Sequence, residues 1–350
     1  MLSNVVRVRD IDPQSLEGPY SLKLARAISG RYLGNGAMYT GVHAAPRDTR
    51  GFFLTAIIDE TSPDQNDERQ KLMVQGGTQY GCSARLCPFC VFSGLEHYRN
   101  LGLEEIVDLF RLALYLHGKS HDHTLDQREL RLKFTDNGEP LLSPLLPQAL
   151  ESILHLFGRE EKILRLKISS ILKDSPLTRV TFREVLAWQA RNLSRASIHL
   201  QVSWSSCKKR TIPPVEVVEM IRDWTRANPA DRVCIAPGLI RGFRRDELEA
   251  FCAALEPVRG RCFIRPSVIK PTTKKQAEMI LTHAEMAEVN NWLGRMGFSV
   301  DPLPQHSTYT EQMKGAGTLS HLPNGKFYYP STYRVWKYTD NGVDPNIPIK

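Results

Sequence analysis

Three cysteines stand close together at Cys82, Cys87 and Cys90, in the stretch "GCSARLCPFC". Three thiolates can hold three irons of a 4Fe-4S cluster and leave the fourth iron open to a substrate or cosubstrate. A zinc site needs a fourth ligand, for which His97 is the near candidate. Three structural cysteines are also compatible with this spacing. The spacing alone therefore leaves a cluster, a zinc site and a structural role open.

A second segment with possible chemistry, "KFTDNGEPLL", contains Gly138 and Glu139. A glycine lets a ligand approach the backbone, and a carboxylate can accept hydrogen bonds from an ammonium group. In isolation such a segment is more typical of a turn before a helix than of a site. Its place one strand and one helix after the cysteines favours a shared site.

Composition narrows the class of protein. The 350 residues carry a formal net charge of +8, which favours an anionic partner. The seven cysteines are odd in number and unevenly spaced, as is typical of a reducing compartment. No apolar run approaches the roughly 20 residues that cross a bilayer. The sequence therefore predicts a soluble, cytoplasmic protein without membrane contact.

Apolar runs of strand length alternate with segments of helical period. Strands are expected at Met73–Tyr80, Glu129–Thr135, Leu164–Ser169, Ser197–Val202, Arg232–Ala236 and Cys262–Arg265, and helices at 103–116, 144–157, 213–224, 246–255 and within 274–297. Six strand–helix units in succession predict parallel strands in an α/β fold, specifically a partial (β/α)6 TIM-like barrel. Both motifs then lie at its C-terminal mouth, where barrel enzymes carry their active sites.

The two ends of the chain do not show this alternation of strands and helices. Residues 1–72 are expected to form a small α+β extension with strands near Phe52–Ile58 and before Met73. Residues 73–300 form the barrel. Residues 301–350, rich in Pro, Tyr and Thr, are expected to form an irregular cap.

Taken together, the motifs resemble the radical S-adenosylmethionine (SAM) superfamily, and most closely its branch of methyltransferases that modify adenine in ribosomal and transfer RNA. "QYGCSARLCPFC" is similar to that branch's cysteine segment, and "NGEPLL" to its glycine–glutamate segment. "IHLQVSWSSCKKRTIP" and the stretch beginning "GFSVDPLPQH" are fainter matches. The likeness covers about residues 55 to 322.

The resemblance implies a 4Fe-4S cluster, SAM and a set of site residues. Cys82, Cys87 and Cys90 would bind the cluster. Gly138 and Glu139 would contact the amino group of SAM. The other implied residues are Ser169, Ser170, His199, Gln201 and Ser267 as further SAM contacts, and Glu60 as the base.

Three departures separate the chain from that branch. Four residues stand between Cys82 and Cys87 where three are usual, and His199 replaces a serine. Ala316 stands where the branch has its methyl-carrying cysteine. Because alanine cannot act as a nucleophile, the methyl relay of that branch is expected to be absent.

The resemblance therefore implies an enzyme that reductively cleaves SAM and abstracts hydrogen from a small, anionic metabolite such as a nucleotide, nucleoside or sugar phosphate. It would need a one-electron reductant of the flavodoxin or ferredoxin type. Basic groups at 208–210, 241–245 and 270–275 suit an anion at the mouth, or are solvated surface. Two alternatives remain, an RNA-modifying enzyme of the same superfamily and a non-catalytic zinc or RNA-binding protein.

Overall fold

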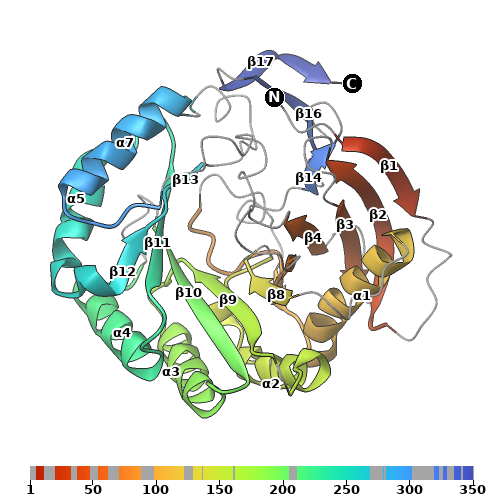
Figure 1. The fold of residues 1–350 in the computed structure, drawn as a ribbon, viewed down its shortest axis with the longest axis horizontal. Helices are drawn as coiled ribbons and strands as arrows, with labels where there is room; N and C mark the ends of the chain where they lie inside the picture. Colours follow the sequence, from red (N-terminus) through yellow and green to blue (C-terminus); the bar gives the residue numbers. More distant parts are fainter. Residues whose placement is uncertain are drawn as a thin grey trace.

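The computed structural model describes most of the chain. The described residues are 5–11, 20–32, 38–47, 54–61, 71–87, 98–121, 129–135, 137–160, 162–204, 211–268, 279, 281–301, 319–322, 326–328, 335–339 and 342–349. They form one large sheet, a row of helices and two smaller sheets of four and two strands (Figure 1). No helix among them is both long and apolar enough to cross a membrane.

Six neighbouring strands of the large sheet are parallel, which confirms the expected α/β class. They are β5 (Lys71–Gly76), β8 (Glu129–Phe134), β9 (Leu164–Ser170), β10 (Ala196–Trp204), β11 (Val233–Leu239) and β12 (Cys262–Ile264). They pair in chain order, each parallel to the next. The expected strands overlap all six, but β5 ends at Gly76, four residues before the expected end.

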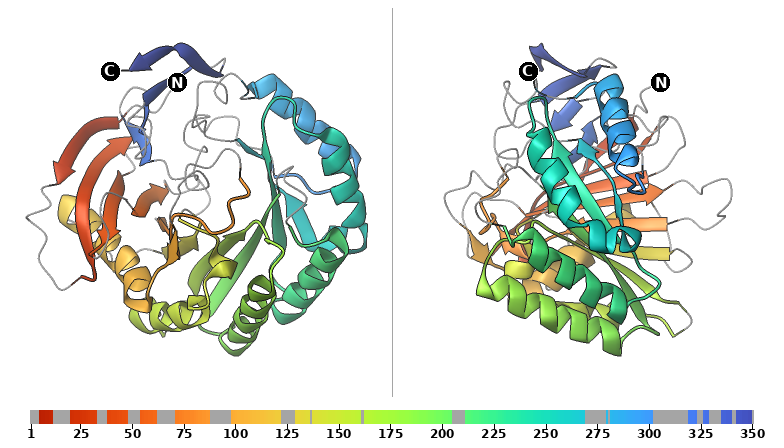
Figure 2. Two further views of the ribbon diagram at one scale, coloured as in Figure 1. Left: turned by 180° about the vertical axis from the view of Figure 1, so that it is seen from behind. Right: turned by 90° about the vertical axis from the view of Figure 1, so that its left-hand side faces the viewer.

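Helices connect these strands and lie on the outer side of the curved sheet (Figures 1 and 2). They are α1 (Leu103–His121), α2 (Leu146–Phe157), α3 (Pro176–Arg191), α4 (Pro214–Ala227), α5 (Arg245–Ala254) and α7 (His283–Arg295), with short 3-10 turns η4 (Pro140–Leu142) and η6 (Glu256–Arg261). The sequence-based helix list lacks α3, whose local signals are the Ser175 cap and Pro176 in the first turn. A capping box at Thr282 starts α7 later than the expected position 274.

The large sheet continues through antiparallel strands on the N-terminal side. These are β1 (Val5–Ile11), β2 (Leu22–Tyr32), β3 (Met38–Pro46) and β4 (Leu54–Thr61), and β4 pairs antiparallel with β5. The described residues before β5 contain strands and no helix, so the helical part of the expected α+β extension is not seen among them. One hydrophobic core runs from Leu22 and Val42 in these strands to Leu166 and Ile264 in the parallel ones.

The sheet bends but stays open in the described residues. Its strand order runs from β1 to β12, and these two strands do not pair with each other. The short β13 (Ser267–Val268) pairs with the later part of β11. Figure 1 shows the helices following the outside of this bend. The parallel sheet flanked by helices thus agrees with the prediction. The expected partial TIM-like barrel is not confirmed, and the described residues form no closed sheet.

The last 50 residues are more regular than expected where the structure describes them. They contain β14 (Leu319–Leu322), β15 (Lys326–Tyr328), β16 (Val335–Thr339) and β17 (Gly342–Ile349), in an antiparallel four-stranded sheet. The prediction of an irregular cap is therefore wrong for these residues. Val, Tyr, Trp and Thr are strand-forming residues, and β16 contains all four.

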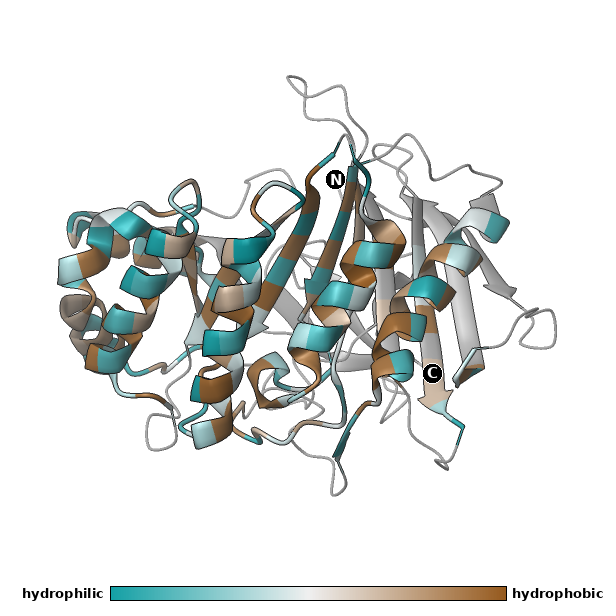
Figure 3. Ribbon diagram, turned by 90° about the horizontal axis from the view of Figure 1, so that it is seen from below, coloured by the Kyte–Doolittle hydropathy of each residue, from teal (hydrophilic) through white to brown (hydrophobic). Residues whose placement is uncertain are grey.

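Alternation along the central strands explains which face carries polar residues. In β9 and β10 every second residue is buried and the residues between are half-buried or exposed. Figure 3 shows the same alternation of hydrophobic and hydrophilic residues. Because neighbouring residues of a strand point to opposite faces, one face packs under the helices and the other is polar. Of the candidate site residues of these strands, Ser169, His199 and Gln201 lie on that polar, concave face, whereas Ser170 at the end of β9 lies on the buried face.

Candidate functional site

The cysteine loop begins with a sharp change of direction after β5. Gly77 lies against the next strand's loop, since a Cβ on it would stand 2.2 Å from the backbone oxygen of Asn137. The chain then forms β6 (Gln79–Tyr80), which pairs with β7 (Arg99–Asn100). Cys82 therefore follows β6 and not β5 directly, which corrects the expected strand 73–80. The backbone amide of Thr78 donates to Asn137 O at 3.0 Å, which fixes the crossing of the two loops.

Gly138 is required where the glycine–glutamate turn meets the cysteine loop. Its φ of +85° lies in the left-handed region, and a Cβ there would stand 2.3 Å from the Cβ of Gln79. The Gln79 Oε1 atom accepts from the amides of Glu139 at 3.0 Å and Ser83 at 3.1 Å. The Gln79 side chain thus connects the two motifs. Sequence reasoning quoted this glutamine within its motif but gave it no role.

Glu139 is buried and its carboxylate is held by three hydrogen bonds. Its Oε1 accepts from the Ser170 hydroxyl at 2.5 Å and the Leu141 amide at 3.3 Å. Its Oε2 accepts from the Ile171 amide at 2.9 Å. An ionised carboxylate has about four acceptor positions, so capacity for another donor remains. Two residues predicted to share a site, Glu139 and Ser170, are therefore in direct contact.

A lysine that the sequence analysis missed joins the same cluster. Lys173 donates from Nζ to the backbone oxygen of Ser83 at 2.9 Å, across the cysteine loop. Its charge also favours the ionised form of Glu139. The chain reaches this position through Leu172, whose φ is +50°. Cys82 itself is buried against Leu142 and Ile171.

Burial dominates the electrostatics of Glu139. It raises the pKa of this carboxyl group to about 7, against the opposing effects of the Ser170, Ile171 and Leu141 hydrogen bonds and of Lys173. Near neutral pH the group therefore changes between its protonated and ionised forms. A cation placed beside it would favour the ionised form and release the proton.

This shift predicts a pH dependence of stability. The folded state binds the Glu139 proton more tightly than the unfolded state does. The protonated carboxyl therefore contributes to the stability of the fold below about pH 4.5, and this contribution is lost as pH rises through 7. We expect the free energy of unfolding, measured with urea, to fall between pH 5 and pH 8. This fall should be larger in the unaltered protein than in Glu139→Gln, by up to about 3 kcal/mol. An equal fall in both would contradict the shift. Glu104→Gln, on the exposed side of α1, is the control and should leave the fall unchanged.

Ser169 and Gln201 lie beside this cluster on adjacent strands. They are register partners of β9 and β10, on the polar face of the sheet. The Ser169 hydroxyl is buried and has no hydrogen-bond partner among the described residues. Such an unpaired buried hydroxyl is costly unless a ligand or water bonds to it. Gln201 has Cys234 as its register partner on the other side.

The remaining predicted residues lie farther from the cluster. His199 lies two residues before Gln201 in β10, and its Nδ1 is 2.9 Å from Asp231 Oδ1. Glu60 pairs with Leu72 at the start of β5, about 13 Å along the strand from its other end, where the cysteine loop begins. The backbone of Ser267 pairs with Gly238 near the end of β11. Glu60 is therefore not brought together with Glu139 and Ser170.

A row of basic side chains crosses the polar face. Lys133 of β8, Lys167 of β9 and His199 of β10 are register partners and are half-buried. Burial lowers the pKa of Lys167 to about 8, with Cys234 raising it and Arg265 lowering it. Residues in register on parallel strands share a face, so the two lysines and the histidine form a basic strip on the concave side. Sequence reasoning missed it because the three residues are widely separated in the chain.

The basic loop residues that the structure describes are already engaged. Arg241 bonds to Glu285 at 2.8 Å, Arg244 bonds to Asp246 at 2.8 Å, and Arg245 lies 4.4 Å from the centre of the Trp292 ring. These contacts favour surface roles for the three arginines. The other basic groups of the predicted rim, Lys208 to Arg210 and Lys270 to Lys275, lie outside the described residues.

Several predicted positions cannot be placed. Cys90, His97 and Ala316 lie outside the described residues, as does the side chain of Glu60. Within the described part of the chain, no three His, Cys, Asp or Glu side chains gather as metal ligands. Arg85, in the gap between Cys82 and Cys87, has a φ of +51°. The longer gap thus includes a residue in the left-handed region.

Comparison with known proteins adds no relative. The sequence matches no protein-family model, and no curated protein matches it.

Proposed function

We propose that this protein is a radical SAM enzyme acting on a small, anionic metabolite. Cys82, Cys87 and Cys90 would hold a 4Fe-4S cluster, and Glu139 with Ser169 would contact SAM. Such a cluster, when bound and reduced, would supply the electron for reductive cleavage of SAM, and the 5′-deoxyadenosyl part of SAM would take hydrogen from the substrate. An external reductant of the flavodoxin or ferredoxin type would provide that electron.

The observation that carries the proposal is the hydrogen-bond network between the two motifs. Gln79 accepts from the amides of both Ser83 and Glu139, and Lys173 reaches the same loop at Ser83 O. The residues around Cys82 and the residue proposed to bind the amino group of SAM are therefore held as one unit. Side chains held by packing and hydrogen bonds keep the geometry that a bound cofactor needs.

The side chains around this unit have the chemistry that SAM requires. Glu139 keeps an acceptor position for an ammonium group, and its pKa of about 7 means that such a group would displace the proton it otherwise holds. Ser169 has a buried hydroxyl without a hydrogen-bond partner among the described residues. A carboxylate or hydroxyl group of SAM could satisfy it. The residues present therefore fit the cofactor.

The class of substrate follows from the strip of Lys133, Lys167 and His199 on the same polar face. Two acidic residues that act on the neighbouring Cys234 are already engaged, Asp231 by His199 and Asp301 by Arg265. An anionic group on the substrate would complement this strip and favour the charged form of Lys167, which burial disfavours. The strip supports an anionic metabolite better than a neutral or cationic one.

The direct test is anaerobic reconstitution of the full chain with iron and sulfide. Bound iron, sulfide and zinc are then measured, and the protein is reduced with dithionite in the presence of SAM. We expect bound iron and sulfide, and 5′-deoxyadenosine and methionine in equal amounts by chromatography. A protein that holds zinc and leaves SAM intact would overturn the proposal in favour of a non-catalytic zinc protein.

A further inference from the structure

A cavity rich in arginine lies at the other end of the parallel strands. Its volume is about 410 Å³, and it is lined by Arg222, Thr225, Arg226, Pro229, Asp231, Arg232, Gly260 and Arg261. These residues come from the end of α4, the connection to β11 and the end of η6. The cavity therefore opens where β11 and β12 begin, whereas the cysteine loop follows the end of β5. It lies away from Glu139 and the cysteine loop, although Asp231 in its lining contacts His199 of the basic strip.

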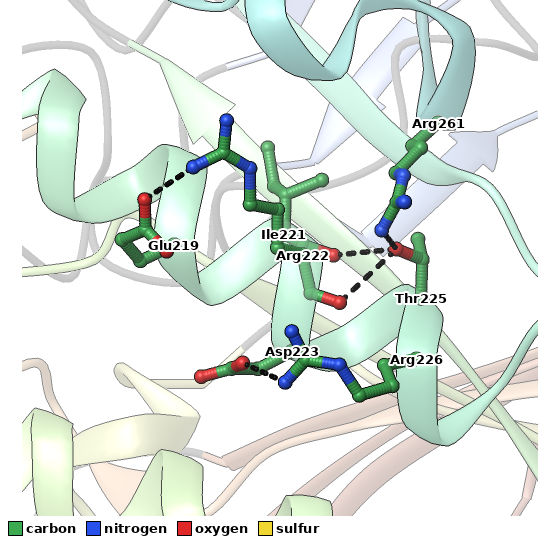
Figure 4. A network of polar contacts seen from close by, with 7 residues as sticks. All are labelled: Glu219, Ile221, Arg222, Asp223, Thr225, Arg226 and Arg261. Atoms are coloured by element: carbon green, nitrogen blue, oxygen red, sulfur yellow. Dashed lines mark hydrogen bonds and ion pairs between the residues drawn. The ribbon is translucent and has the colours of Figure 1, made fainter.

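Among the described residues, the hydrogen bonds of two of the arginines go to neutral atoms. Arg261 donates to the Thr225 hydroxyl at 3.1 Å, and this hydroxyl in turn donates to the backbone oxygen of Ile221 at 2.9 Å (Figure 4). Arg232 donates to the backbone oxygen of Cys262 at 2.6 Å and lies over the Phe263 ring. Each guanidinium has five N–H groups, so most donors of both remain available. Neither charge is neutralised by a carboxylate in the described residues.

The other two arginines are oriented by acidic neighbours on their own helix. Arg222 bonds to Glu219 at 2.5 Å and Arg226 to Asp223 at 2.9 Å, as Figure 4 shows. The one acidic residue in the lining, Asp231, has each oxygen engaged, one by His199 and the other by the Trp224 indole N–H. The excess of positive charge at the cavity is therefore carried by Arg232 and Arg261.

A simpler explanation covers only part of this arrangement. Cations near the end of a helix interact favourably with the helix dipole, which accounts for Arg226 in the last turn of α4. It does not account for Arg232 and Arg261, which come from two other elements and meet α4 residues at the same cavity. Three segments place four arginines around one hollow, and two of these arginines have no carboxylate partner among the described residues. Arginines gathered in this way suit an anion.

We propose that this cavity binds the phosphate of a small phosphorylated ligand. Two N–H groups of one guanidinium can bond to two oxygens of one phosphate group. A spherical anion or a neutral ligand does not offer this paired contact. The volume falls within the range of about 300–1,000 Å³ typical of small-molecule sites, so the ligand is larger than phosphate alone. This site does not depend on the cysteines or on SAM.

The test is calorimetric titration of the full chain with inorganic pyrophosphate at low ionic strength, with sodium chloride of equal ionic strength as the blank. The cavity variant is Arg232→Ala/Arg261→Ala. The control is Arg183→Ala/Arg295→Ala, which removes two exposed arginines outside the cavity and gives the same net charge. Arg232→Lys/Arg261→Lys keeps the charge and removes the fork. A circular dichroism melt of each variant establishes that it folds.

We expect pyrophosphate affinity to fall at least about tenfold in the cavity variant, less in the lysine variant and hardly in the control. Equal losses in the cavity variant and the control would mean general charge attraction and overturn the site. Absence of pyrophosphate binding by the unaltered protein would also overturn it. Short single-stranded RNA is titrated in parallel, and RNA binding that needs Arg232 and Arg261 without pyrophosphate binding would exclude a small ligand.

Discussion

The variant Cys82→Ala/Cys87→Ala/Cys90→Ala is expected to bind no iron–sulfur cluster and to form 5′-deoxyadenosine at least about a hundredfold more slowly than the unaltered protein. Changes to groups that merely support metal ligands cost 10- to 100-fold, and this variant removes the ligands themselves. Iron content and nucleoside yield after identical reconstitution provide the measurement. A variant that keeps its iron and still cleaves SAM would show that these thiols are not the ligands.

The chain provides a matched control in three other cysteines. Cys234, Cys252 and Cys262 are buried in the sheet and its helices. Burial raises the pKa of the Cys252 thiol to about 12 and of the Cys262 thiol to about 11, and it raises that of Cys234 as well. Because protonated thiols are poor ligands, replacing all three with alanine should leave iron content and SAM cleavage nearly unchanged. Equal loss in both triple variants would indicate damage to folding.

Gly138→Ala is expected to lower the free energy of unfolding by about 3 kcal/mol and to reduce SAM cleavage at least about tenfold. The new Cβ would be strained at a φ of +85° and would collide with Gln79 at 2.3 Å. Relief of this collision moves Gln79, which bonds to both Glu139 and Ser83. Urea unfolding and 5′-deoxyadenosine yield measure the two effects separately.

Gly242 provides the control for backbone strain alone. Its φ is +77°, but a Cβ there would meet nothing within 4 Å. Gly242→Ala should therefore cost about 1 kcal/mol and leave SAM cleavage unchanged. If the two alanine variants were equally stable, the close approach of Gly138 to Gln79 would have no energetic importance.

Local patterns were sufficient to find the parallel sheet. The strands β8, β9 and β10 alternate apolar with polar residues, and the expected ranges agree with them to within two residues at each end. Helices such as α2 have a clear apolar face, which local spacing also reveals. The contact of Glu139 with Ser170 follows from two neighbouring parallel strands whose carboxyl ends meet at one edge.

The pairing of strands that are far apart in the chain could not be predicted from local patterns. The described residues between 5 and 61 form the strands β1 to β4. Whether these strands form a separate unit or extend the large sheet depends on the pairing of β4 with β5. This pairing also puts Glu60 at the edge away from the cysteine loop. Strand partners are chosen by packing and backbone hydrogen bonds between distant segments, and a local pattern holds no record of them.

By itself, the sequence determined the α/β class, the order of the strands and the two motifs, because periodicity and residue type are local properties. Only the tertiary structure decided the proton affinity of Glu139, the strip of Lys133 with Lys167, and the cavity that contains Arg261. Each of these depends on burial or on charges contributed by separate segments. Desolvation and electrostatic interactions act through space, so they arise only when folding brings those segments together.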